Sequence, residues 1–299
     1  MNAAATTVAT ALLLLSPCLW MPLGLGLIDA HGDRERRLRR LARRLHAPAA
    51  ALLVAAFLLP TGTAAALLCA PWLAVTALLA AAGLLHLRSA RAAWSAALGE
   101  SAALGYPLIG AAWALAARAD AVPLGFSAAI ALLTAAHFHH AGFTLPLATA
   151  RLARHRPGRA TGAAVWLVVA GMPVTAAGIT ATQLGASPWI ERLCAGATAL
   201  AALFAALLLL RAAADAARPA ALPPRARTLL SIAGAALAVG MTLALLYAAR
   251  HAFAPVFGGD EARALDWMVY SHAVTNGVLF AGGAVLGWRA AAGGTLSRR

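Results

Sequence analysis

The sequence contains no lysine and little charge: 11% of its 299 residues are charged and 6% are aromatic, whereas 62% are hydrophobic. A soluble domain has about a quarter of its residues charged, and a soluble helical protein needs a polar stripe on each helix. Most apolar runs in this chain have no such stripe. These absences exclude an ordinary soluble protein. They predict an all-α fold, a polytopic bundle of transmembrane helices whose many small residues let the helices pack closely.

Cysteine is also scarce. Cys18, Cys69 and Cys194 each stand alone in or beside an apolar run, without the spacing of a metal or redox site and without a disulfide pattern. We therefore expect buried free thiols. The chain also has no internal repeat, no glycine-rich phosphate loop and no long linker. We expect residues 1–299 to form a single integral membrane domain.

The apolar runs predict about nine membrane spans, near residues 5–28, 47–69, 71–87, 95–117, 122–150, 162–183, 189–210, 228–249 and 267–288. Twenty of the 24 arginines fall in alternate loops and in the C-terminal tail. Short loops rich in arginine stay on the cytoplasmic side of a membrane. The pattern predicts an N-terminus outside the cell, a C-terminus inside, and a multi-pass protein of the cell membrane.

The segment 29–46 carries seven of these arginines, and Leu38, Leu41 and Leu45 recur in it at helical spacing. This pattern predicts a basic amphipathic helix in a cytoplasmic loop, lying on the membrane surface and attracted to anionic lipid. Such a segment is also compatible with nucleic-acid binding. Because the arginines lie between apolar runs, we expect the lipid bilayer as partner and no nucleic acid.

Three histidines, His137, His139 and His140, interrupt the fifth predicted span. Polar side chains at this depth are costly, and they usually face a bundle interior or a cavity and mark function. At 100° per residue, His137 and His140 share a face with Thr134 and Thr144. This face is predicted to line a cavity, whereas His139 points nearly opposite and is expected to hydrogen-bond a neighbouring helix.

Two further polar positions lie in other spans. Glu100 is a carboxylate well inside the fourth span, and we expect it to be paired or protonated there. The last span presents His272 and Asn276 on one face, with Asp266 at its outer mouth. His86, at the end of the third span, is expected to lie at the membrane interface.

Depth separates the predicted polar groups. At about 1.5 Å per residue, His137 lies roughly 22 Å below the outer end of its span and His272 roughly 9 Å below the outer end of its own. This difference argues against one metal ion held by both. Glu100 comes nearer in depth to His140, within about 7 Å on the same rise per residue.

The chain resembles the YndJ-like family of bacterial integral membrane proteins. The resemblance rests on Leu133-Thr-Ala-Ala-His-Phe-His-His-Ala-Gly-Phe143, on Ile109-Gly-Ala-Ala-Trp113 and on Met268-Val-Tyr-Ser-His-Ala-Val-Thr-Asn-Gly277, and it covers roughly residues 95–290. It implies a helical protein of the bacterial inner membrane. Members are sometimes described as transporters, but the resemblance implies little about mechanism.

The chain departs from the family pattern at two positions. His140 stands where the family has a tyrosine-like residue, and His272-Ala273 stands where it has a His-Gly pair. The His-Phe-His motif is also similar to that of haem-copper oxidases, in which both histidines hold haem irons. The other histidines that such an oxidase needs for copper have no counterpart in this chain, which excludes a complete oxidase.

Three functions remain open. The first is a membrane-embedded enzyme acting on a lipid-soluble, isoprenoid-like or acyl substrate, with His137 and Glu100 as acid and base and with His272 and Asn276 as further catalytic residues. The second is a small-solute transporter or proton relay through the same groups, and the third is a structural or regulatory role. Haem or a transition metal on His137 and His140 is a further alternative, although we expect no cofactor. The predicted cavity-lining residues are Thr134, His139, His140, Thr144, Tyr106 and Asp266.

Overall fold

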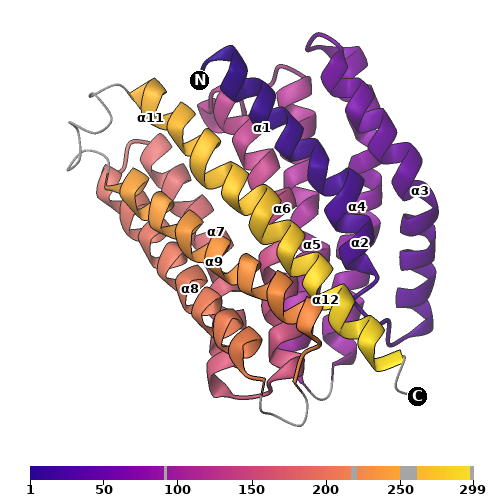
Figure 1. Ribbon diagram of the computed structural model, residues 1–299. Coiled ribbons are helices and arrows are strands. Elements are labelled where there is room, and N and C mark those ends of the chain that lie inside the picture. The colour runs from indigo at the N-terminus through magenta and orange to yellow at the C-terminus, as the bar shows by residue number, and fades with distance from the viewer. Residues whose placement is uncertain (91–92, 217–220, 250–260, 297–299) are drawn as a thin grey trace. The chain divides into compact units, whose positions relative to one another are not determined.

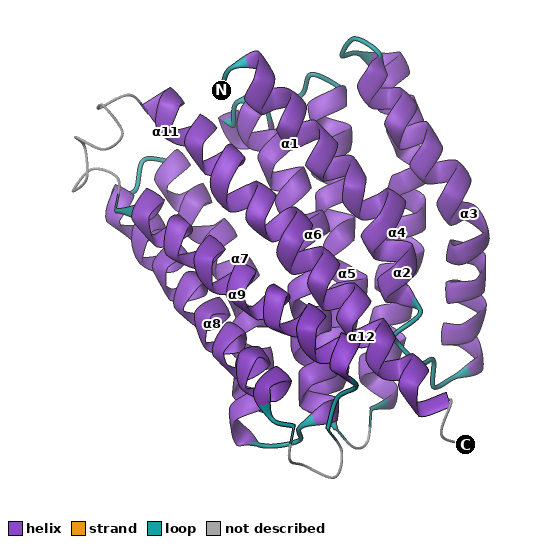
Figure 2. Ribbon diagram, viewed as in Figure 1, coloured by secondary structure: helices purple, strands orange, loops and turns teal. Residues whose placement is uncertain are grey.

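The computed structural model describes residues 1–90, 93–216, 221–249 and 261–296. All regular structure in these residues is helical (Figure 2), which confirms the all-α prediction. Arg91, Arg218, Arg250, Arg298 and Arg299, which contribute to the arginine asymmetry of the sequence, lie outside the described residues.

Most helices are long and connected by short loops (Figure 1). The first helical segment consists of α1 (Ala3–Leu15), the π-helix η1 (Ser16–Trp20) and α2 (Met21–Leu25). It is followed by α3 (Asp33–Leu58), α4 (Thr63–Ser89), α5 (Trp94–Arg118), a 3₁₀ turn η2 (Pro123–Gly125), α6 (Ala128–His155), α7 (Arg159–Gln183), α8 (Pro188–Ala214) and α9 (Pro224–Ala248). The last segment contains α11 (Glu261–Met268), two π-helices η3 (Val269–Ala273) and η4 (Thr275–Phe280), and α12 (Ala281–Leu296).

Seven helical segments of the described residues are long and apolar enough to cross a membrane. They include the first segment, the last segment, α3, α4 and α7 to α9. The two remaining long helices, α5 and α6, contain Glu100 and the three histidines of the fifth predicted span, which lower their hydropathy. The chain therefore has the helices of a multi-pass membrane protein. The number of nine spans and the orientation remain predictions.

The helices group into two compact units. One unit comprises Ala9–Ala150 and contains α3, α4, α5 and most of α1 and α6. The other comprises Met1–Val8 and Arg151–Arg299 and is built mainly from α7, α8, α9 and the last segment. The single domain remains a prediction.

The basic segment 29–46 differs from the prediction, because it is not a separate surface helix. It forms the first half of α3, which continues without interruption through Pro48 to Leu58. The predicted second span, 47–69, is likewise wrong at its end. Leu59 is extended, as the residue before a proline tends to be, and Gly62 has a φ of 137°. The chain therefore reverses at residues 59–62, and Pro71 lies inside α4 rather than at its start.

Candidate functional site: a buried acid–base cluster

The centre of the candidate site is the imidazole of His86, near the end of α4. Its Nδ1 lies 3.1 Å from Oε1 of Glu35 on α3, and its Nε2 lies 2.9 Å from Oε2 of Glu100 on α5. His86 and Glu100 are completely buried, and Glu35 is 2% exposed. Three consecutive helices of the unit Ala9–Ala150 thus bring two carboxylates and one imidazole into direct contact.

Glu35 is positioned by the start of its own helix. It occupies the third position of α3, where a carboxylate is favoured by the helix dipole and reaches back to the preceding backbone N–H groups. Its Oε2 accepts a hydrogen bond from the backbone N–H of His31 at 2.9 Å. The second oxygen, Oε1, is thereby left to face His86.

Arg39 follows Glu35 by one helical turn and is 8% exposed. Its Nη1 lies 3.4 Å from Oε1 of Glu35, and its Nη2 donates to the backbone carbonyls of Leu25 and Ile28 at 3.0 and 2.5 Å. Leu25 ends α2, and the last carbonyls of a helix lack partners within it. Arg39 therefore both balances the charge of Glu35 and fixes the end of the first helical segment.

The number of protons in the cluster follows from its contacts. Each of the two N···O contacts of His86 requires one proton, either on the ring nitrogen or on the carboxyl group. Two carboxylates and an imidazole that share these two protons carry a net charge of −1, which Arg39 neutralises. Removing one member of such a buried ionic group leaves an uncompensated charge. The stability of Glu35, His86, Glu100 and Arg39 in this buried place therefore depends on all four being present.

One edge of the cluster reaches the surface of the unit through His31. The ring of His31 stacks on that of His86, with centroids 4.8 Å apart and an interplanar angle of 24°. His31 itself is exposed. A titratable ring in contact with solvent thus lies against the buried imidazole.

The residues of the predicted histidine motif on α6 lie in different environments. His137 is exposed, Thr134 is half-buried, and His140 and Thr144 are buried. Positions three residues apart on a helix differ by 60° in direction, and this offset suffices to separate the surroundings of His137 and His140. The cavity predicted for this face remains a prediction, as does the role of His137 as acid or base.

His139 has the packing role that its direction predicted. Its Nδ1–H donates to the carbonyl of Ala135 at 2.7 Å, and its Nε2 accepts a hydrogen bond from Trp72 Nε1 on α4 at 2.8 Å. A Cβ atom on Gly110 of α5 would lie 2.5 Å from His139 Nδ1. The ring therefore fills the space between three helices, and both of its nitrogens are satisfied.

Two other histidines bind carbonyls of the kinked first segment. Pro17 O would normally accept a hydrogen bond from residue 21 or, in a π-helix, from residue 22. The N–H of Met21 goes to Ser16 O, and Pro22 has no N–H. His46 on α3 provides the missing hydrogen, at 2.7 Å from Pro17 O.

His140 makes an equivalent contact one turn earlier in the first segment. Its Nε2 donates to the carbonyl of Leu12 at 2.5 Å, close to where Pro17 supplies no N–H to the preceding turn. The opposite nitrogen, His140 Nδ1, and the hydroxyl of Thr144 are buried and have no hydrogen-bond partner among the described residues. These two atoms are one turn apart on α6.

Tyr106, predicted to line the cavity, packs beside α6 in the same unit. Its ring lies edge-on to Phe138, with centroids 6.0 Å apart. A Cβ atom on Gly142 would lie 2.8 Å from Tyr106 Cβ, so the absence of a side chain at Gly142 lets α5 and α6 approach closely here.

The remaining predicted residues belong to the other unit. His272 Nδ1 lies 2.7 Å from the carbonyl of Gly240 on α9, and the amide of Asn276 lies 3.2 Å from the same nitrogen. A Cβ atom on Gly240 would lie 2.3 Å from that amide. His272 and Asn276 thus share a face of the last segment, directed at α9.

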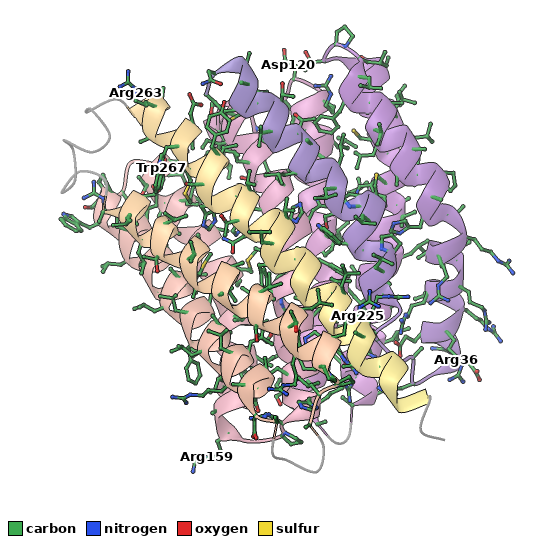
Figure 3. All side chains as sticks on the ribbon, in the orientation of Figure 1. Arg36, Asp120, Arg159, Arg225, Arg263 and Trp267 are labelled. Carbon is green, nitrogen blue, oxygen red and sulfur yellow. The ribbon has the colours of Figure 1, made fainter. Side chains whose placement is uncertain are left out.

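Asp266 lies on the last segment and binds the N-terminus of the chain. Its carboxylate accepts hydrogen bonds from the backbone N–H of Asn2 at 3.0 Å and from Asn2 Nδ2 at 2.8 Å. The Asn2 side chain also accepts a hydrogen bond from Tyr270 Oη at 3.2 Å. These residues line an open surface hollow together with Arg263 and Trp267, and Figure 3 labels these last two on the last segment.

The structure pairs Glu100 with His86, which the sequence reasoning placed at the membrane interface. His86 has no exposed surface, and its depth at the membrane interface remains a prediction. Glu35 and Arg39 were assigned to a surface helix and were missed altogether. One signal was present: His86 and Glu100 lie near facing ends of consecutive helices joined by a short loop, which brings such positions together in an antiparallel pair.

The described residues contain no cluster of side chains that could bind a metal ion. No group of three or more His, Cys, Asp or Glu residues in residues 1–90, 93–216, 221–249 and 261–296 is arranged to hold a metal ion. A site on His137 and His140 remains a prediction from the sequence.

Apolar helices of membrane-spanning length, with ionisable groups buried among them, define a multi-pass integral membrane protein. The chain belongs to the YndJ-like protein family, whose model matches residues 11–280. Comparison with curated proteins and with solved structures found no similar protein in either set.

Proposed function

We propose that the protein is a proton-coupled membrane transporter in which the Glu35–His86–Glu100 cluster takes up and releases the coupling proton. The observation that carries this proposal is the contact of both nitrogens of one buried imidazole with carboxylate oxygens. Imidazole can receive a proton on one nitrogen and release one from the other, and it does so near neutral pH. Chains of carboxylates and histidines inside membranes serve as proton relays in pumps and transporters.

The proposed step is a transfer along the two contacts. With His86 as imidazolium, transfer of the Nε2 proton to Glu100 Oε2, 2.9 Å from that nitrogen, converts Glu100 to the acid and leaves a neutral imidazole that still donates to Glu35. Once Glu100 has released this proton, a proton from solvent reprotonates His86 Nε2 and restores the imidazolium. His31, which is exposed and stacked on His86, marks the side of the cluster that solvent reaches. Arg39 Nη1, 3.4 Å from Oε1 of Glu35, provides a positive charge beside this carboxyl group. In the orientation predicted from the arginine-rich loops, this entrance is on the cytoplasmic face.

A membrane-embedded enzyme acting on a lipid-soluble substrate is the second candidate. It is favoured by His140 Nδ1 and Thr144 Oγ1, which are buried one turn apart on α6 without a hydrogen-bond partner in the part of the chain that the structure describes. A hydroxyl or carbonyl at the end of an isoprenoid-like or acyl molecule could bind both atoms. In this alternative, His137 and Glu100 keep their proposed roles as acid and base.

A flux measurement distinguishes the two. The protein is reconstituted into liposomes that contain a pH-sensitive dye, and proton entry is followed under an imposed pH gradient with and without candidate small solutes outside. We expect Glu100→Gln to lower proton entry by about 100-fold or more, the lower end of the contribution of a positioned proton-transferring group. Glutamine keeps the shape of the side chain and its hydrogen bond to His86.

The matched control is Asp120→Asn, which removes one exposed carboxylate from a turn of the same unit. Its proton entry should equal that of the wild type. Equal flux through Glu100→Gln and wild type, with both proteins folded, would reject the relay. If Thr144→Val instead abolished conversion of a lipid-soluble substrate, the enzyme would be favoured.

A further inference from the structure

Three arginines near the start of α3 face away from the acid–base cluster. Arg40, Arg43 and Arg44 are exposed, and none of them has an ion-pair partner among the residues that the structure describes. Their spacing of three and four residues places them on one face of the helix. Figure 3 shows Arg36, one turn earlier, on the outer side of the same helix. Arg36 is paired with Asp33.

The register between α3 and α4 gives the depth of these arginines. The two helices run antiparallel side by side (Figure 1) and are joined at residues 59–62. The contact of Glu35 with His86 fixes their alignment at the opposite end. Residues 40–44 of α3 therefore lie level with residues 77–81 of α4, which are all alanine or leucine.

The length of α3 leads to the same conclusion. From Ala47 to Leu58 the helix extends roughly 18 Å at 1.5 Å per residue, whereas the hydrocarbon core of a bilayer is about 30 Å thick. The apolar part of α3 is too short to cross this core alone. At least the turn that carries Arg40, Arg43 and Arg44 must lie at the level of the inner leaflet.

Arginines at this depth need an anionic partner. An unpaired guanidinium is costly in hydrocarbon, and a long side chain lowers the cost by extending towards the headgroups. A phosphate group satisfies the planar guanidinium through paired N–H···O bonds. Leu41 and Leu45, which are 45% and 42% exposed, present apolar surface beside the arginines where an acyl chain can lie.

We propose that Arg40, Arg43 and Arg44 form a binding site for the phosphate headgroup of an anionic phospholipid, with its acyl chains along Leu41 and Leu45. The site is built from exposed side chains of α3 and does not depend on the proposed transport function. The ligand is a lipid of the surrounding leaflet, because the arginines lie level with the apolar residues of α4.

The test compares phospholipids that differ in headgroup charge. Purified full-length protein in a neutral detergent is titrated with phosphatidylglycerol or phosphatidylcholine, and bound lipid is counted by native mass spectrometry. We expect the wild type to prefer phosphatidylglycerol. The triple variant Arg40→Gln, Arg43→Gln, Arg44→Gln should bind it about 10- to 100-fold more weakly, since a basic residue near anionic lipid contributes roughly a tenfold factor or less.

The matched control replaces three exposed arginines at the ends of other helices, Arg159→Gln, Arg211→Gln and Arg225→Gln, and so removes the same charge. It should keep the phosphatidylglycerol preference. An equal loss in both triple variants would show that net charge alone attracts lipid and would overturn the site. An unchanged affinity in the α3 variant would also overturn it. Titration with inorganic phosphate should show no competition for the site at matched concentration, and competition would favour a soluble anion as the ligand.

Discussion

Buried histidines in the unit Ala9–Ala150 have two kinds of partner. His46, His139 and His140 contact backbone carbonyls and an indole N–H, all of which are neutral. His86 contacts two carboxylates. A neutral partner fixes a ring in one tautomer and one position, whereas a carboxylate can exchange a proton with it. The difference shows that the partner of a buried histidine, more than its depth or its motif, indicates its role.

The largest effect is expected from removing the charged centre. His86→Ala leaves the carboxylates of Glu35 and Glu100 without their shared partner, and breaking a buried ionic group costs about 3–5 kcal/mol. The variant should unfold well below the wild type in thermal denaturation in detergent.

His31→Ala is the control for this change. It removes an exposed ring that only stacks on His86, and it should cost less than about 0.5 kcal/mol, as for most surface substitutions. If His31→Ala destabilised as much as His86→Ala, the charge-balanced description of the cluster would be wrong.

An intermediate effect is expected from crowding a neutral histidine. In Gly110→Ala the new methyl group would lie 2.5 Å from His139 Nδ1 and 3.0 Å from the carbonyl of Ala135. Overpacking of this kind costs about 1–3 kcal/mol. Gly105→Ala on the same helix meets nothing within 4 Å and should be neutral or stabilising by up to about 1 kcal/mol. Chemical denaturation of both variants tests the pair, and equal stabilities would contradict the close packing at His139.

The smallest effect is expected from one neutral hydrogen bond. Trp72→Phe removes the N–H that donates to His139 Nε2 and should cost about 1 kcal/mol, the net contribution of a neutral hydrogen bond, because the apolar contacts persist. A double-mutant cycle with His139→Gln measures the coupling, which should be at least about 0.5 kcal/mol for residues in contact. A coupling of zero would mean that the indole and the imidazole do not stabilise each other.

Composition and arginine distribution were sufficient to predict an all-α membrane protein, and the motifs on α5, α6 and the last segment were sufficient to predict the YndJ-like family. Glu100 was recognised because a carboxylate inside an apolar run is conspicuous. Its partner His86 was not recognised, because His86 lies close to the end of a helix, where residues commonly lie at the membrane interface. Glu35 lies 51 residues away from His86 in the sequence and is hidden among arginines.

The roles of His46 and His140 also could not be predicted, and the reason is a different one. Both follow from the hydrogen-bond register of the first segment, where a π-helix and two prolines leave carbonyls without their usual donors. Pro17 and Pro22 are visible in the sequence. Which carbonyls they leave without donors depends on whether the turn between them is α or π, and a periodicity of apolar residues does not reveal this.

The hydrogen bond between His140 and Leu12 also constrains the order of biosynthesis. Its two residues are 128 positions apart, so the ribosome must synthesise the intervening chain before the bond can form. At about 5–20 residues per second, this interval lasts roughly 6 to 26 seconds. Ser16, whose hydroxyl donates to the carbonyl of His139, must wait equally long. The first helical segment therefore enters the membrane before the helix that completes its hydrogen bonding exists, and its final packing belongs to a late stage of insertion.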